Sequence, residues 1–312
     1  MSFSVLRTDE AWWVRVPAGA RRIDTSATTT AELIADRSAV PRSVSGDGPT
    51  VDPSELELLS PVTAPCRVIA QMTNYVSHVR DSGMDPGKVP LTFFRKSSGS
   101  ISGPTADIVK PGQVSLLDYE VEIGLVFGQT LPVGSTVDNE SLAELVAGLV
   151  ITNDVSARDV QLPKTQFYEA KSYPSFTPVG PVLLLLEPGE WAKFPTLTLQ
   201  LRVNGVTRQN SSVADMIYSP LEAVRALTRF QRVDAGDLLL TGTPGGTALT
   251  APPKPIEMIG ALLPPHVKWK AFFRRQANNP KYLKHGDIVE ADIRSGDGTL
   301  DLGTQRTVVR EA

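Results

Sequence analysis

Two acidic residues, Glu120 and Glu122, lie two positions apart in a stretch (117–128) whose apolar residues alternate as in a β-strand. The alternation places the apolar side chains on one face of the strand and the two carboxylates on the other. Neighbouring carboxylates repel each other unless a positive charge lies between them, and a hard divalent cation coordinated by oxygen is the usual solution. An exposed strand with an acidic outer face is the alternative, and this stretch by itself favours neither.

A third carboxylate, Asp154, comes directly after an apolar run that begins at Val150. The carboxylate therefore lies at the end of a predicted strand, which is a common place for a metal ligand. Arg158 and Asp159 follow within one turn, and Gln161 adds a neutral hydrogen-bonding group. A surface turn would have the same composition, so the cluster alone does not establish a site.

His78 and Asp81 are three positions apart, which places both side chains on one face of a helical turn, where they can hydrogen-bond. A carboxylate that holds one imidazole nitrogen leaves the other nitrogen as an oriented base, and this pairing activates water in hydrolases. A surface helix with a solvated histidine and aspartate is the alternative.

Two further residues stand next to loops that could hold them in place. Lys171 precedes a proline-rich loop with aromatic residues, which could position the ammonium group, although a single lysine is also common on a solvated surface. Thr243 lies in a Gly-Thr-Pro-Gly turn, where the backbone and the hydroxyl group can approach a ligand closely.

The remaining periodicity predicts the elements that would position these residues. A capping box at Ser219–Glu222, with proline at the first helical position, indicates the start of a helix, and Asn204-Gly205 indicates a tight hairpin turn. Further helices are expected over 30–37 and 142–149. The expected strands cover residues 2–6, 12–16, 66–71, 182–186, 197–203, 238–240 and 288–293.

Composition limits the class of protein. The 312 residues are 41% hydrophobic and 21% charged, as in a typical globular protein, and the abundant glycine and proline favour strands and turns. A net charge of −3 and a pI near 5.7 argue against nucleic acid or an anionic membrane as the partner. The single Cys66 excludes an internal disulfide and a cysteine-rich metal site. With no apolar run of transmembrane length and no signal peptide at the N-terminus, we expect a cytoplasmic protein.

The pattern of elements suggests a small N-terminal region over 1–60 and a main catalytic domain over 61–312. Residues 43–53 are rich in Gly, Ser, Pro and Asp and are expected to form a linker. Within the main domain, residues 251–283 contain six prolines and a cationic stretch with Trp269. We expect this segment to be an insertion on a β framework, either a lid or an oligomer contact.

Several motifs occur together in one order over residues 59–309, and with them the chain resembles the fumarylacetoacetate hydrolase family. The motifs are Asn74-Tyr75-x-x-His78, Phe94-x-Lys96 with Gly103-Pro104, Asp118-Tyr119-Glu120-Val121-Glu122, Asn153-Asp154-Val155-Ser156-Ala157-Arg158-Asp159, Ala170-Lys171, Pro178-Val179-Gly180-Pro181 and Thr241-Gly242-Thr243-Pro244-Gly245. The resemblance implies an α+β, predominantly β fold with a mixed rolled-sheet or barrel core, a few flanking helices and a homodimer. It also implies a divalent cation, Mg²⁺ or Mn²⁺, held by Glu120, Glu122 and Asp154.

The resemblance and the residues together predict a metal-dependent hydrolase that cleaves a carbon–carbon bond in a small anionic 2-oxo acid, such as an acylpyruvate. His78, oriented by Asp81, would deprotonate a water that attacks the distal carbonyl group. The metal and Lys171 would stabilise the resulting enolate, and Arg158, Gln161 and Thr243 would steady the bound substrate.

Other functions remain compatible with the same residues. Oxaloacetate decarboxylation, keto–enol tautomerisation and isomerisation of a hydroxymuconate-type diacid would use the same metal site, because each passes through an enolate. A non-catalytic metal-binding scaffold is a further alternative.

Overall fold

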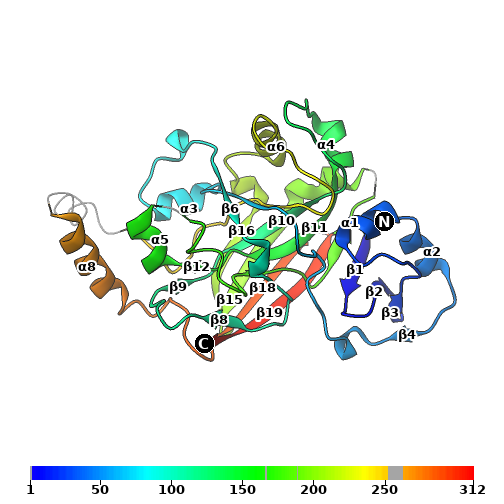
Figure 1. Cartoon of the computed structure of the whole chain (residues 1–312), viewed down its shortest axis with the longest axis horizontal. Helices are drawn as coiled ribbons and strands as arrows, with labels where there is room; N and C mark the ends of the chain where they lie inside the picture. The colour runs from blue at the N-terminus through cyan, green and yellow to red at the C-terminus, as the bar shows by residue number, and fades with distance from the viewer. Residues whose placement is uncertain (1, 166, 188, 252–262) are drawn as a thin grey trace.

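The computed structural model describes residues 2–165, 167–187, 189–251 and 263–312. In this part of the chain two larger sheets pack together, with short helices around their edges (Figure 1). Residues from both sheets, such as Leu125, Ile151, Leu199 and Ile293, belong to one hydrophobic core. The expected α+β, mostly β architecture is confirmed.

The first sheet has ten strands and carries the acidic residues. Their order is β4-β3-β2-β1-β14-β11-β10-β17-β5-β6, and every pair is antiparallel except β17 with β5. The bounds are β1 (Phe3–Arg7), β2 (Trp12–Val16), β3 (Gly19–Arg22), β4 (Thr50–Val51), β5 (Val68–Gln71), β6 (Phe93–Lys96), β10 (Val121–Phe127), β11 (Val146–Asn153), β14 (Leu183–Leu185) and β17 (Leu238–Leu240).

The second sheet has five strands in the order β16-β15-β18-β19-β8, and two strand pairs stand beside it. Among the described residues each sheet is open at its edges, so the strands do not close into a barrel. The bounds are β7 (Ile101–Ser102), β8 (Ile108–Lys110), β9 (Leu117–Asp118), β12 (Ser156–Ala157), β13 (Thr177–Pro178), β15 (Leu197–Val203), β16 (Val206–Ser212), β18 (Ile288–Ser295) and β19 (Asp301–Glu311).

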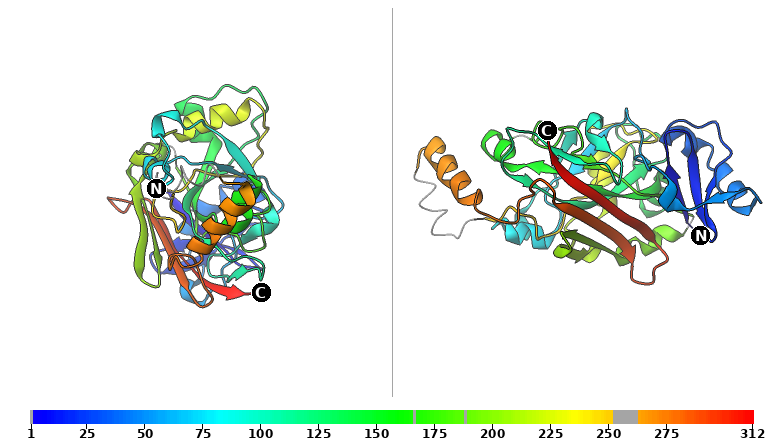
Figure 2. Two further views of the ribbon diagram at one scale, coloured as in Figure 1. Left: turned by 90° about the vertical axis from the view of Figure 1, so that its left-hand side faces the viewer. Right: turned by 90° about the horizontal axis from the view of Figure 1, so that it is seen from below.

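The helices are short and lie mainly around the sheets, except for one that projects from the body (Figures 1 and 2). The α-helices are α1 (Thr30–Ala35), α2 (Ala39–Ser45), α3 (Val76–Asp81), α4 (Asn139–Leu145), α5 (Arg158–Lys164), α6 (Pro220–Thr228) and α8 (Pro265–Gln276). The 3₁₀ helices are η1 (Pro53–Glu55), η2 (Pro86–Lys88), η3 (Ser98–Ser100), η4 (Glu190–Thr196) and η5 (Val213–Asp215).

Local signals explain where several elements begin and turn. At the start of α6 the Ser219 side chain accepts from the backbone N–H of Glu222, and the Glu222 carboxylate accepts from that of Ser219, so the predicted capping box is confirmed. Asn204 and Gly205 both have positive φ and join β15 to β16, as the hairpin prediction required.

The helix expected over 142–149 is only half correct. The helix α4 ends at Leu145, and β11 begins at Val146 and continues to Asn153. The apolar spacing matches a helix, but residues 146–153 have the backbone pairing of a strand, because β10 offers a full ladder of hydrogen bonds along this segment.

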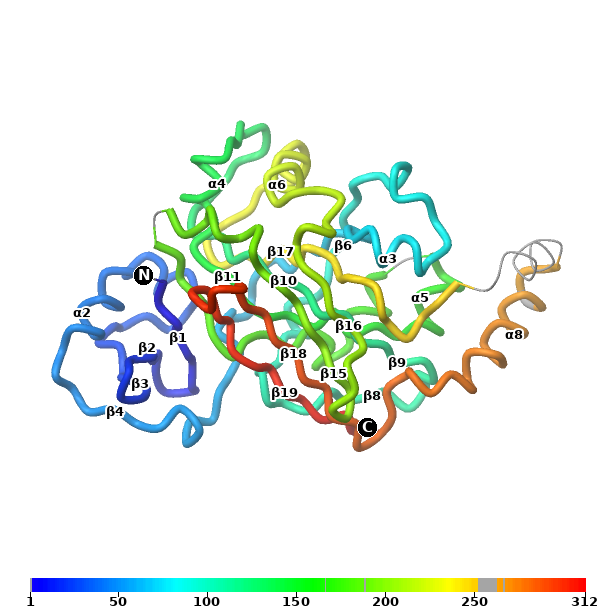
Figure 3. The backbone as a smooth tube through the Cα atoms, turned by 180° about the vertical axis from the view of Figure 1, so that it is seen from behind, coloured from blue at the N-terminus to red at the C-terminus, as the bar shows by residue number. Residues whose placement is uncertain are grey.

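The N-terminal strands extend the main sheet, because β1 pairs with β14. The segment expected as a linker contains the end of α2 and all of β4. In the late segment the described helix α8 extends away from the rest of the molecule, while its Phe273 packs against the core (Figures 2 and 3). The central part of the expected insertion, 252–262, lies outside the described residues. In the described chain no helix has the length and apolar character needed to cross a membrane.

Candidate metal centre

The three expected carboxylates converge where β10 and β11 pair. Glu122 lies in β10 and Glu120 directly precedes it, while Asp154 directly follows β11. The antiparallel register pairs Val121 with Asn153, so the next residues meet, and the N–H of Asp154 donates to the Glu120 carbonyl oxygen (2.8 Å). One oxygen of each carboxylate lies within 4.8 Å of the others. The pairing of β10 with β11 therefore brings together carboxylates that are 32 or more positions apart in the sequence.

These carboxylates are buried, which rules out the alternative of an acidic surface. Glu120, Glu122 and Asp154 are 4%, 2% and 1% exposed. The strand β10 lies between β11 and β17, and both of its faces are covered, so even the side of the strand that carries the acidic residues is inside the protein. A buried carboxylate must be paired or coordinated to stay charged, because desolvation disfavours the ionised form.

Two buried lysines contact the carboxylates directly. The Lys171 ammonium donates to Oε2 of Glu120 (2.6 Å) and to Oδ2 of Asp154 (2.5 Å). Lys96, on β6, donates to the other oxygen of Asp154 and to the carbonyl oxygen of Phe176. The structure thus places Lys171 at the centre, as expected, and adds Lys96, which the sequence motif contained but for which no role was predicted.

Arg158 joins the centre to its surroundings through three different partners. Its guanidinium donates to Oδ2 of Asp118 (2.8 Å), to Oε1 of Gln161 (2.8 Å) and to the Glu120 carboxylate. The Asp118 carboxylate also accepts from the backbone N–H groups of Ala248 and Leu249. Arg158 and Gln161 therefore bind protein groups in this structure, and their expected contact with a substrate stays a prediction.

Glu122 differs from the other two acidic residues of the centre because no basic side chain contacts it. Burial alone would raise the pKa of Glu120, but the positive charges of Arg158 and Lys171 outweigh it and lower that pKa. Glu122 has no cation against it, and its carboxylate accepts from the N–H of Gly242 (2.7 Å). Burial, together with Asp154 and Glu120, raises the pKa of Glu122 well above its ordinary value.

The pKa values of the two buried lysines are shifted in opposite directions. Burial works against the Lys171 charge, but Asp154 and Glu120 overcome it and raise the Lys171 pKa. For Lys96 burial dominates, so its pKa is lowered despite its contact with Asp154. Counting Asp118, three buried basic side chains face four buried carboxyl groups, so one carboxyl group, that of Glu122, has no basic partner.

The residues present fit a hard divalent cation. Three converging carboxylates offer only oxygen donors, and such donor sets select Mg²⁺, Mn²⁺ or Ca²⁺ over softer metals. The lack of a basic partner for Glu122 is the specific observation that calls for a further cation, since burial and the neighbouring carboxylates raise the pKa of this residue and a metal ion would oppose that rise.

His78 and Asp81 lie on α3 as expected, but they do not form the expected pair. Nδ1 of His78 is buried and has no hydrogen-bond partner among the described residues. The Asp81 carboxylate instead accepts from the N–H of Gly246 (2.9 Å). Asp81 is the last residue of α3, and the tight loop at Gly245 and Gly246 passes close to its carboxylate, so tertiary contact replaces the local pairing.

The charges of the centre nevertheless act on His78. Burial lowers the His78 pKa, with Glu120 acting against this effect and Arg158 and Lys171 adding to it. The ring is therefore neutral at neutral pH and can accept a proton.

Thr243 belongs to the framework of the site. Its hydroxyl group donates to the Val121 carbonyl oxygen (2.9 Å) and accepts from Nε2 of Gln209 (2.8 Å). The Gln209 side chain also accepts from the N–H of Val121 (3.0 Å), so it ties β16 to β10. Sequence reasoning missed Gln209 because its spacing carries no signal, and it left Asp118 without a role although that residue adjoins the acidic pair.

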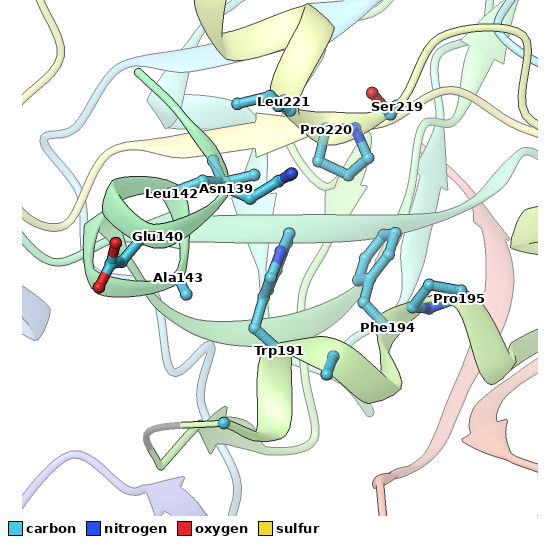
Figure 4. A pocket seen from close by; sticks show the side chains of 12 residues that line it. Asn139, Glu140, Leu142, Ala143, Trp191, Phe194, Pro195, Ser219, Pro220 and Leu221 are labelled. Atoms are coloured by element: carbon cyan, nitrogen blue, oxygen red, sulfur yellow. The ribbon is translucent and has the colours of Figure 1, made fainter. Parts of the chain in front are cut away.

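An apolar pocket of about 560 Å³ lies elsewhere, between α4, η4 and α6 (Figure 4). Leu142, Trp191, Phe194 and Pro220 line it, and Glu140 is its single carboxylate. None of the residues expected to do chemistry lies in this pocket. We therefore place the functional site at the buried carboxylates, where charge and donor atoms converge.

The chain matches the fumarylacetoacetate (FAA) hydrolase C-terminal family over residues 67–310. A mitochondrial oxaloacetate tautomerase of Bos taurus is 32% identical over 82% of this chain and 72% of the relative. A 2,4-didehydro-3-deoxy-L-rhamnonate hydrolase of a Sphingomonas species is 31% identical over 80% of this chain and 75% of the relative. Both matches include the region that carries the carboxylates, because each covers at least four-fifths of the chain.

Solved structures agree with the fold. The crystal structure of a probable 2-hydroxyhepta-2,4-diene-1,7-dioate isomerase from Mycobacterium abscessus has a TM-score of 0.76 at 28% identity, and the match covers 100% of this chain and 99% of the other. A fumarylacetoacetate hydrolase from Exiguobacterium antarcticum has a TM-score of 0.73 at 25% identity, with full coverage of both chains. These relatives include proteins named as tautomerases, hydrolases and isomerases.

Proposed function

We propose that this chain, which belongs to the fumarylacetoacetate hydrolase family, is a metal-dependent enzyme for small anionic 2-oxo acids, with keto–enol tautomerisation as its reaction. The observation that carries the proposal is the buried centre itself, in which three acidic side chains converge and one of them, Glu122, has no basic partner. Glu120, Glu122 and Asp154 would hold Mg²⁺ or Mn²⁺. The ion, when bound, supplies a Lewis acid for the oxygens of a 2-oxo acid.

The chain's own residues would bind the substrate and move the proton. Lys171 holds its ammonium group between Glu120 and Asp154, where it would stabilise the negative charge that develops on an enolate oxygen. His78, whose ring is neutral, would take a proton from the carbon next to the carbonyl group, and the carbonyl oxygen would receive the proton to form the enol; the reverse transfer would form the keto acid. Tautomerisation requires only this proton transfer, with no attacking water.

The surroundings of His78 support tautomerisation over hydrolysis. A base that activates water is commonly held by a second group, and the carboxylate expected in that role, Asp81, binds Gly246 instead. The names of several relatives, which are oxaloacetate tautomerases, support the same choice.

Carbon–carbon hydrolysis of an acylpyruvate-like 1,3-diketone is the second candidate. The relative named as a hydrolase favours it. In that reaction His78 would deprotonate a water, and Asp81 would have to leave the N–H of Gly246 to orient the imidazole ring. The two candidates share the metal centre and differ in what His78 must do.

The test is a panel of oxaloacetate and acetylpyruvate, assayed with metal-free protein and after addition of Mg²⁺ or Mn²⁺. Loss of enol absorbance reports tautomerisation, and released pyruvate reports hydrolysis or decarboxylation. Protein-free samples with the same metal correct for the reactions of free ions. We expect metal-dependent loss of enol, and full activity after exhaustive chelation would sink the proposal.

Two variants assign the activity to this centre. Glu120→Ala removes a carboxylate of the centre and should abolish both metal binding and turnover. Glu144→Ala removes an exposed carboxylate on α4 and should leave both unchanged. His78→Ala should abolish pyruvate release if the enzyme is a hydrolase.

A further inference from the structure

Arg208 occupies an irregular position on the strand β16. The β15–β16 register pairs Leu201 with Gln209 and Arg202 with Thr207, which leaves Arg208 as the extra residue of a β-bulge. A bulge interrupts the alternation of side chains and re-aims the bulged residue, and bulges are common next to active sites. The side chains of Arg208 and Gln209 can therefore point to the same side of the strand, whereas neighbouring side chains of a regular strand point to opposite sides.

The Arg208 side chain has no acceptor for its donor groups. It is half-buried, its Nε atom is shielded from solvent, and it makes no hydrogen bond or ion pair within the described residues. A buried donor without an acceptor is unfavourable, and most such groups are satisfied by a partner, a water or a ligand. Arg158, by contrast, has protein partners on three of its nitrogens.

The bulge lies against the loop that borders the metal centre. A Cβ atom on Gly246 would lie 2.0 Å from the carbonyl oxygen of Arg208, so the two backbones are in close contact. Gly246, whose φ is +103°, also donates to Asp81 on the helix that carries His78. At its other end the same loop donates from Gly242 to Glu122.

A second contact ties this loop to the segment that carries the acidic residues. The hydroxyl group of Tyr119, the residue before Glu120, donates to the carbonyl oxygen of Gly246 (3.3 Å).

We propose that Arg208 binds the distal carboxylate of a dicarboxylate 2-oxo acid and so sets the substrate class of this enzyme. The inference rests on the proposed function, in which the metal centre and Lys171 receive the 2-oxo acid head. A guanidinium forms bidentate, charge-assisted hydrogen bonds with a carboxylate and gains much less from a neutral acyl group. A four-carbon diacid such as oxaloacetate is then preferred over acetylpyruvate, whose distal group is uncharged.

The kinetic test compares both substrates in three variants. Arg208→Gln removes the charge, and Arg208→Lys keeps it without the bidentate geometry. Arg229→Gln removes an exposed arginine at the C-cap of α6 as a matched control. We expect Arg208→Gln to raise KM for oxaloacetate by about tenfold to a hundredfold, and to change KM for acetylpyruvate by less than about threefold. The KM of Arg208→Lys for oxaloacetate should lie between the values of the wild type and Arg208→Gln. Arg229→Gln should have the KM values of the wild type for both substrates.

Equilibrium binding tests Arg208 without turnover. Malate and 2-hydroxybutyrate have the same 2-hydroxy acid head and differ in the distal carboxylate, and neither can enolise. In calorimetric titrations of the Mg²⁺-loaded protein, we expect Arg208→Gln to weaken malate binding alone. Equal losses for malate and 2-hydroxybutyrate, or no loss for either, would overturn the role of Arg208. Absence of turnover by the wild type on both substrates would instead refute the proposed function, and the calorimetric result would still decide the role of Arg208.

Discussion

At the scale of single residues, the three carboxylates of the centre are not equivalent. Glu120 is neutralised by Arg158 and Lys171, and Asp154 by both lysines, whereas Glu122 has only a backbone N–H. Removing one member of a buried ion pair leaves its partner uncompensated, which is more costly than removing a group that had no charged partner. The same chemical change should therefore have different effects at the two glutamates.

We expect Glu120→Gln to lower the free energy of unfolding of the metal-free protein by about 3–5 kcal/mol, because Arg158 and Lys171 lose a buried counter-charge. Glu122→Gln should leave that free energy unchanged or raise it, because it removes the carboxylate whose pKa is raised by burial and repulsion. Urea unfolding after chelation measures both effects. Both variants should bind Mg²⁺ on the order of a hundredfold more weakly in calorimetry. Equal destabilisation by the two changes would contradict this division of roles.

The pH dependence of activity should report His78. Burial, the largest influence, lowers its pKa below the ordinary value of 6.5. The neutral base therefore persists as the pH falls through 6.5, and activity is lost only when the pH passes below the lowered pKa. We expect the acid limb of kcat/KM, measured at saturating metal, to lie below pH 6.5. His78→Asn should remove this limb along with most of the activity, and an acid limb above pH 6.5 would refute the assignment.

At the scale of elements, the strand β10 organises the centre. It carries Glu122 and pairs with β11 and β17, which lead to Asp154 on one side and to the Gly242–Thr243 turn on the other. The close packing depends on Gly124. A Cβ atom there would lie 2.7 Å from Val150 and 2.8 Å from Leu238.

Gly124→Ala should consequently strain the core beneath the metal centre. Both neighbours are fully buried, so we expect a loss of about 1–3 kcal/mol in the free energy of unfolding. Gly112→Ala is the matched control, since no atom lies within 4 Å of the added Cβ. Thermal and urea unfolding of the two variants provide the comparison, and similar stability for both would show that β10 tolerates the extra methyl group.

At the scale of the whole molecule, the two larger sheets form one core, while α8 projects from the body with its Phe273 against that core (Figure 2). An isolated helix of twelve residues is only marginally stable in water, so a helix that projects in this way gains stability when another surface covers it. The exposed side chain of Val267 on α8 is consistent with such a contact.

We expect the protein to be a homodimer in solution, as the family resemblance implies. Light scattering coupled to size exclusion should give a mass near twice the chain mass of 33.6 kDa. Repeating the measurement over a tenfold dilution distinguishes a stable dimer from weak association. A mass equal to one chain at all concentrations would contradict the expectation.

The residues of the metal centre could be named from the sequence because they carry their own signals. Glu120 and Glu122 share a strand face, and Asp154 follows an apolar run, so alternation and strand ends made them candidates, and the family resemblance implied their role as metal ligands. The Ser219 capping box and the Asn204-Gly205 turn were equally readable, since both depend on neighbouring residues only. In each case the determining interactions are local in the chain.

The sequence by itself determined the family, the mostly β architecture and the three converging carboxylates. Tertiary structure alone decided which charges meet. Lys96 and Lys171 reach Asp154 from different elements, Asp81 turns from His78 to Gly246, and the bulge at Arg208 appears only when β15 and β16 pair. The physical reason is that a buried charge or donor takes whichever partner the fold brings near, and that partner need not be close in sequence.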